Sequence, residues 1–140
     1  MKAGRKFWFT DPFLKNAYDS LLARRKSFSH RGKISFDTEP SDDYEWLTVV
    51  FQATNRLVLV LQMIEGNRAD IFIRSNNAKD RGKIVARIED LFLVDNGAEL
   101  TRAVDATITL IRLADSHEDV SRAAIEKAWD RVMIGATPKC

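Results

Sequence analysis

Five acidic side chains lie close together in the first half of the chain, at Asp37, Glu39, Asp42, Asp43 and Glu45. Clustered carboxylates bind hard cations and can hold the two metal ions of a hydrolytic site. Their spacing does not fit the calcium-binding loop, which repeats acidic residues at alternate positions before a glycine. A solvated loop that keeps an edge strand from pairing with another chain uses the same residue types. A metal-dependent hydrolase using residues 37–45 is therefore one hypothesis, and no residue is assigned as a metal ligand.

Other residue patterns that support catalysis are missing from the sequence. His30 and His117 have no second histidine four residues further on and no neighbouring cysteine, which excludes the common zinc sites. No GxxxxGK[ST] or GxGxxG loop is present to bind phosphates, and no GxSxG turn carries a nucleophile. The single cysteine, Cys140, is the last residue and has no histidine near it in sequence. We assign no catalytic residue and no cofactor, and we favour a protein that is not an enzyme.

Charge is divided unevenly along the chain. Residues 1–34 carry nine basic and two acidic side chains, a formal charge of +7, whereas the other 106 residues carry 13 basic and 18 acidic ones, a formal charge of −5. Such a division indicates contact with a charged partner, or between the two parts of the chain. The basic residues that are candidates for binding a partner or phosphates are Arg24, Arg25, Lys26, Arg31 and Lys33, followed by Lys79 and Arg81.

A nucleic-acid-binding protein that uses the basic segment 24–33 is a second hypothesis. No recognisable nucleic-acid-binding module accompanies these residues, and the sequence pI of 8.8 lies below the values above 9 that are typical of such domains. A further candidate for partner contact is Trp8, in the aromatic run Phe7-Trp8-Phe9. This run either packs on the sheet or docks against another chain, and we favour packing.

The first third of the chain predicts a helix and then strands. Asp11-Pro12 is a helix start, because aspartate caps the free backbone N–H groups and proline suits the first helical position. Apolar residues follow at helical spacing up to Leu22, and the basic residues at 24–26 are expected in the last turns before Gly32.

Strand patterns follow at 33–37, 46–53, 56–64 and 70–74, which predicts an antiparallel meander. Gly66-Asn67 suits a type II′ hairpin turn. The middle strands carry apolar residues on both sides, so both faces of the sheet centre are expected to be covered, by helices or by a second subunit. Segment 83–94 fits a helix or a strand, and we favour a helix. Asn96 with Glu99, and Ser116 with Asp119, resemble capping boxes that begin two further helices.

The sequence therefore predicts a single α+β domain over 1–140, with an N-terminal helix, an antiparallel sheet of about four strands and two or three C-terminal helices. The longest apolar run, 57–61, is far shorter than the roughly 20 residues that span a membrane. No secretory signal pattern is present and only one cysteine is found, so we expect a cytoplasmic protein without membrane contact. The leading hypothesis is a small soluble protein-binding module that is not an enzyme, of the inhibitor, immunity-protein or chaperone kind, with a protein partner or a second copy of itself as a homodimer.

Overall fold

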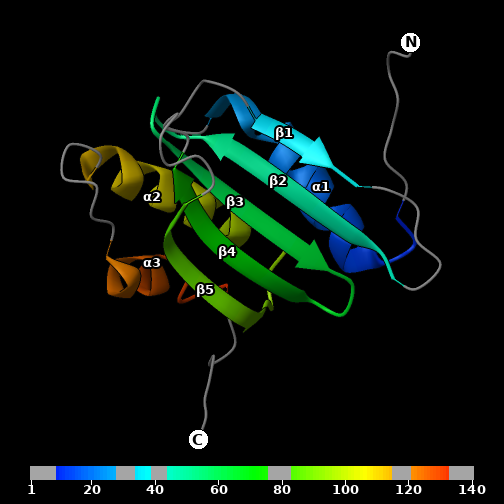
Figure 1. Ribbon diagram of the computed structural model, residues 1–140. Coiled ribbons are helices and arrows are strands. Elements are labelled where there is room, and N and C mark those ends of the chain that lie inside the picture. The colour runs from blue at the N-terminus through cyan, green and yellow to red at the C-terminus, as the bar shows by residue number, and fades with distance from the viewer. Residues whose placement is uncertain (1–8, 28–33, 39–43, 76–82, 115–120, 133–140) are drawn as a thin grey trace, which may run out of the picture.

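The computed structural model describes residues 9–27, 34–38, 44–75, 83–114 and 121–132. Its centre is a five-stranded antiparallel sheet in which every strand pairs with its neighbour in sequence. The strands are β1 (Ile34–Asp37), β2 (Trp46–Gln52), β3 (Leu57–Ile64), β4 (Arg68–Ser75) and β5 (Ile84–Phe92). The helices are α1 (Pro12–Ala23), the short 3-10 turn η1 (Arg25–Ser27), α2 (Ala98–Ala114) and α3 (Arg122–Ala128) (Figure 1).

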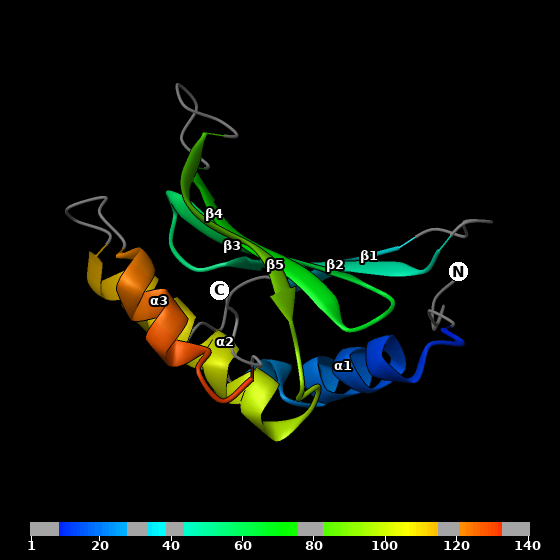
Figure 2. The ribbon, with the colours of Figure 1, turned by 90° about the horizontal axis from the view of Figure 1, so that it is seen from below.

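The predicted α+β fold is confirmed: an N-terminal helix, an antiparallel meander and two C-terminal helices follow one another along the described chain. The sheet has five strands where about four were predicted. Figure 2 shows that α1, α2 and α3 all lie on the same face of the sheet. The molecule therefore has two layers, one of helices and one of strands.

The fifth strand corrects the helix favoured for segment 83–94. This segment forms β5, which pairs with β4 from Ile84 to Phe92. Asp90 takes a positive φ of 60°, and the pairing slips at this point. Because of this bulge, Ile88 and Leu91 both point into the core although they are three residues apart. A spacing of three residues imitates one face of a helix, which explains the wrong prediction.

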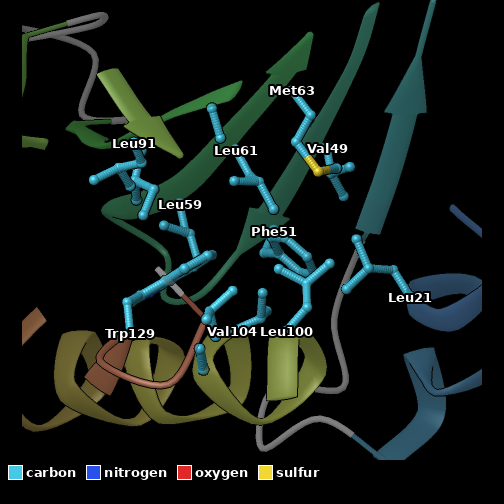
Figure 3. Packing of buried hydrophobic residues seen from close by; sticks show 14 of the residues in the cluster. Leu21, Val49, Phe51, Leu59, Leu61, Met63, Leu91, Leu100, Val104 and Trp129 are labelled. Atoms are coloured by element: carbon cyan, nitrogen blue, oxygen red, sulfur yellow. The ribbon is translucent and has the colours of Figure 1, made fainter. Parts of the chain in front are cut away.

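The hydrophobic core lies between the sheet and the helices (Figure 3). Strand β2 alternates strictly, with Leu47, Val49 and Phe51 fully buried on the helix side. Figure 3 shows Leu21 of α1 and Leu100 and Val104 of α2 directed at the same cluster. Burial of apolar area of this kind is the main driving force of the fold.

The start of each helix is fixed by a side chain that accepts hydrogen bonds from free backbone N–H groups. Asp11 accepts from the Leu14 N–H at 3.0 Å, which confirms the predicted start of α1. The capping box predicted at Asn96 is wrong, because the Asp95 carboxylate one residue earlier accepts from the N–H groups of Gly97, Glu99 and Leu100 at 2.8–3.1 Å. Helix α3 is capped by Ser121; the box predicted at 116–119 lies outside the described residues.

Helix α3 is joined to α2 by a buried tryptophan. The side chain of Trp129 is fully buried, and its indole N–H donates to the Thr107 hydroxyl at 2.8 Å. The Thr107 hydroxyl in turn donates to the carbonyl oxygen of Ala103 at 2.8 Å. Every polar atom in this contact is satisfied, as a buried tryptophan requires.

The β3–β4 hairpin forms at the predicted Gly66-Asn67 step, but with a different turn. Gly66 has φ of 89° and Asn67 has φ of 68°. Two positive φ values in succession are typical of a type I′ turn, whereas a type II′ turn has a positive φ only at its first central residue. The backbone N–H of Leu93 donates to the carbonyl oxygen of Asn67 at 2.7 Å, and the Asn67 side chain donates to the Leu93 carbonyl at 3.0 Å. The tip of this hairpin is thereby attached to the residue after β5.

We predict that Gly66→Ala lowers the free energy of unfolding by about 1 kcal/mol, because an L-residue is strained at positive φ. A Cβ at position 66 meets no atom within 4 Å, so only backbone strain contributes. The matched control is Gly97→Ala, whose Cβ would make an ordinary contact at 3.6 Å with the Ser20 hydroxyl. Urea unfolding of both variants tests the prediction; equal stability of the two would contradict it.

Candidate protein-binding surface

The sheet has one face that no described helix covers (Figure 2). The strand register places alternate residues of each strand on this outer face, away from α1, α2 and α3. The two-sided apolar pattern predicts cover on both faces, from helices or from a second subunit. The described helices cover the inner face only. The outer face is formed by Ser35, Asp37, Trp46, Thr48, Val50, Gln52, Val58, Val60, Gln62, Ile64, Arg68, Asp70, Phe72, Arg74, Ile84, Arg87, Glu89 and Phe92.

An apolar strip crosses the middle of the outer face. Val50 of β2, Val60 of β3 and Phe72 of β4 are cross-strand neighbours in one row of the register. Val58, two residues from Val60 on the same strand, extends this strip. Val58 and Val60 are only 5% and 2% exposed, yet they are not part of the cluster that packs against the helices. The strip is therefore a second apolar layer on the side of the sheet that lacks helices.

A second apolar group lies at one end of the outer face. Trp46 of β2 stands beside Ile64 of β3, which is 39% exposed. Phe92 of β5 is 46% exposed and belongs to the same row, with Arg68 of β4 between it and Ile64. Large apolar side chains that gather on one exposed face mark contact surfaces, whereas scattered ones do not.

Charges on the outer face are concentrated on β4 and β5. Arg87 lies over the ring of Phe72, with its guanidinium carbon 5.7 Å from the ring centre, and pairs with Glu89 at 3.1 Å. Arg68 pairs with Asp90 at 3.4 Å. These pairs are exposed, and each contributes little to stability. The outer face of β2 carries no charge at all (Trp46, Thr48, Val50 and Gln52), while that of β4 carries Arg68, Asp70 and Arg74.

Glu45 holds the start of α1 against the sheet. It immediately precedes β2, and its carboxylate accepts from the backbone N–H of Thr10 at 3.0 Å, the Thr10 hydroxyl at 2.9 Å and the Asp11 N–H at 2.8 Å. The Thr10 N–H lowers the pKa of the Glu45 carboxyl most, burial opposes this change, and the Asp11 N–H and the Thr10 hydroxyl lower the pKa further. The backbone N–H of Glu45 donates to the Glu65 carboxylate at 2.9 Å.

The acidic candidates do not form a metal site among the described residues. The Glu45 carboxylate already accepts hydrogen bonds from the backbone N–H groups of Thr10 and Asp11. Asp37 lies on the edge strand β1. Glu39, Asp42 and Asp43 lie outside the described residues. No group of three or more metal-ligating side chains is found in the described parts of the chain. His30 and His117 also fall outside them.

The basic candidates are placed only in part. Arg24, Arg25 and Lys26 are exposed and follow the end of α1, so the prediction that they lie in its last turns is wrong. Arg24 caps the C-terminal end of α1, and Arg25 and Lys26 belong to η1, which follows it. The other candidates, Arg31, Lys33, Trp8, Lys79 and Arg81, lie outside the described residues. Phe9, next to Trp8, packs against Tyr18 with ring centres 6.1 Å apart.

Comparison with known protein families, curated proteins and solved structures found no match to this chain. Within the described residues, no helix has the length and apolar character needed to cross a membrane. The surface must therefore be interpreted from its own chemistry.

We predict that Glu45→Gln lowers the free energy of unfolding by about 1 kcal/mol near neutral pH, because a neutral amide accepts these hydrogen bonds less strongly than a carboxylate. The pKa of Glu45 is lowered by folding, so its contribution is present above the unfolded pKa of about 4.3 and is lost as pH falls through the folded pKa. The difference between wild type and variant should shrink toward about pH 3. Urea unfolding at both pH values measures it.

Glu89→Gln is the matched control, since Glu89 makes only an exposed ion pair with Arg87. Its effect near neutral pH should stay below about 0.5 kcal/mol. A Glu45→Gln effect as small as that of the control, or one that persists unchanged in acid, would show that the carboxylate does not hold the start of α1.

Proposed function

We propose that this protein is a small protein-binding module, not an enzyme, that holds its partner on the outer face of the sheet. One observation carries the proposal: the apolar strip and the apolar end group share the one sheet face that no described helix covers. A sheet that only faced solvent would alternate between apolar and polar sides. Ile64 and Phe92 are 39% and 46% exposed on this side, and they leave water only when another surface packs against them.

The composition of the outer face supports a protein partner. Trp46 and Phe72 are half-buried aromatic residues, and aromatic side chains together with arginine dominate binding energy at protein interfaces. Polar uncharged residues, Thr48 and Gln62, stand next to the apolar strip and can form the hydrogen bonds of an interface rim. A cytoplasmic location is part of the same proposal and rests on the single cysteine of the chain.

The nucleic-acid alternative keeps one supporting observation, the three successive exposed cations Arg24, Arg25 and Lys26. Phosphate contact by these residues would release counterions, so binding would weaken steeply with salt. No aromatic residue lies among these three cations for bases to stack on. For this reason the outer face, which combines aromatic and polar groups, is the preferred binding surface.

The test is capture of partners by the immobilised protein from an extract of its native cell, with the variants Trp46→Ser and Phe72→Ser. We expect the amount of captured protein to fall at least about tenfold with either variant, because each removes an aromatic anchor. The same fall is expected for captured copies of this chain when they are added in free form. The matched control is Leu113→Ser, because Leu113 is 74% exposed but belongs to α2 on the opposite layer.

Equal capture by wild type and both outer-face variants would contradict the proposal. So would capture of nucleic acid alone that disappears in high salt and in the triple variant Arg24→Glu, Arg25→Glu, Lys26→Glu. Circular dichroism and thermal unfolding of each variant establish that a lost signal reflects the surface and not the fold.

A further inference from the structure

We infer that Asn96 is a site of spontaneous deamidation, and that the Asp95 carboxylate beside it controls the rate of this modification. Asn96 is followed by Gly97, and this is the only Asn-Gly step in the sequence. Glycine has no side chain to shield its backbone nitrogen and adopts many backbone conformations, so this nitrogen reaches the side chain of a preceding asparagine easily. The site lies at the start of α2 and is independent of the proposed function.

The reaction needs only the chain itself and water. The Gly97 nitrogen loses its proton to solvent hydroxide and attacks Cγ of Asn96. The N–Cγ bond forms, and the Cγ–Nδ2 bond breaks to release ammonia, which takes up a proton from water. Water then opens the resulting cyclic imide at either of its carbonyl carbons. One product is aspartate, and the other is isoaspartate, in which the main chain runs through the former side chain and is longer by one carbon atom.

In the folded protein, the attacking nitrogen is already held by another group. The Gly97 N–H donates to Oδ1 of Asp95 at 2.8 Å, the shortest of the three hydrogen bonds that this oxygen accepts at the start of α2. The Gly97 carbonyl oxygen accepts from the Thr101 N–H at 3.0 Å, so hydrogen bonds fix the residue on both sides of its Cα. Asn96 and Gly97 are also half-buried. Attack on Asn96 therefore requires the bond to Asp95 to break and the peptide plane to turn.

The charge of Asp95 acts in the same direction as its hydrogen bond. The attacking nitrogen must first become an anion, and a carboxylate at hydrogen-bond distance repels that anion. A carboxylate is also a weak base, so it holds the amide proton without removing it. Asp95 therefore slows deamidation in the folded state, and local opening at the start of α2 determines how fast it proceeds.

Conversion at Asn96 changes the attachment of α2 to the core. The Asp95 oxygen also accepts from the Leu100 N–H at 3.1 Å, and the side chain of Leu100 is fully buried. Isoaspartate at position 96 lengthens the main chain between Asp95 and Gly97, so the carboxylate no longer meets the free N–H groups of the helix start. The isoaspartyl form is therefore the less stable form of the protein.

The test follows the tryptic peptide 88–102 by mass spectrometry while the protein is kept at mildly alkaline pH, either folded or in urea. A sample taken at zero time gives the background. In urea, Asn96 should convert faster than every other asparagine of the chain. In the folded protein its conversion should be at least about tenfold slower than in urea, because reaction there requires local opening. Labelling by an isoaspartyl methyltransferase measures the isoaspartate product separately.

Asp95→Ala tests the role of the carboxylate. It should raise the rate in the folded protein at least about fivefold, the factor that corresponds to the loss of one hydrogen bond, and leave the rate in urea unchanged. Glu99→Gln is the matched control, because it removes a carboxylate of the same turn that pairs with Arg102 and not with Gly97. Its rate should equal that of wild type.

Two further variants complete the experiment. Asp95→Ser keeps a neutral acceptor at the helix start, so its rate should lie between those of wild type and Asp95→Ala. Gly97→Ala should suppress conversion in both states, because its Cβ shields the nitrogen. This Cβ makes only an ordinary contact with the Ser20 hydroxyl, at 3.6 Å, so the fold is expected to persist.

Equal rates in folded and urea-unfolded wild type would overturn the inference, since the fold would then exert no control over the nitrogen. Faster conversion at another asparagine in urea would also overturn it. Urea unfolding of each variant gives its fraction of unfolded chains, whose contribution is subtracted from the measured rate. Corrected rates of Asp95→Ala and Asp95→Ser no higher than that of wild type would contradict the role assigned to Asp95.

Discussion

The alternation of side chains in a strand is the constraint on which this structure depends. Every strand of an antiparallel sheet presents its residues to two faces, and each face needs its own cover if its residues are apolar. Here the helices from both ends of the chain, α1 on one side and α2 and α3 on the other, cover the same face. The chain thus completes one hydrophobic core and leaves the second apolar layer on the outer face of the sheet.

The one-sided arrangement is held in place by a few polar contacts at the ends of elements. Glu45 attaches the start of α1 to the start of β2, and Asn67 attaches the β3–β4 hairpin to the residue after β5. Trp129 attaches α3 to α2 through Thr107. These contacts orient the helical layer on the inner face, while the outer face takes no part in them. Changes at the exposed residues of this face, such as Ile64 and Phe92, therefore leave these contacts intact.

The sequence predicted the parts of the fold that depend on local patterns. Asp11-Pro12 and Gly66-Asn67 are local signals, and the helix start and the hairpin appear where they indicate. The strand at β5 was missed because the bulge at Asp90 spaces Ile88 and Leu91 like residues of a helix, and the bulge arises only from pairing with β4. Local spacing carries no information on such tertiary pairing.

The candidate surface was predictable only to the point that the middle strands are apolar on both sides. Which side the helices cover, and that Phe72 and Phe92 lie on the uncovered side with Trp46, follows from the register of four strand pairs and not from any single segment. The charge clusters that stand out in the sequence predicted binding sites elsewhere, a basic segment at 24–33 and an acidic one at 37–45. Among them, Arg24, Arg25 and Lys26 follow the end of α1, and Glu45 supports the fold.

The meander also has a consequence for the order in which the chain folds. Successive strands are joined by connections of three residues (65–67) to eight residues (38–45 and 76–83). The pairing of neighbouring strands therefore closes only short loops. The contact of α1 with β2 and that of residue 94 with residue 132 join far more distant parts of the chain. Because short loops close at lower entropic cost, the sheet can assemble before its helical layer is in place. Both faces of the nascent sheet are then apolar and exposed together, and premature association through the inner face would trap a misfolded form that mature packing of α1 and α2 prevents.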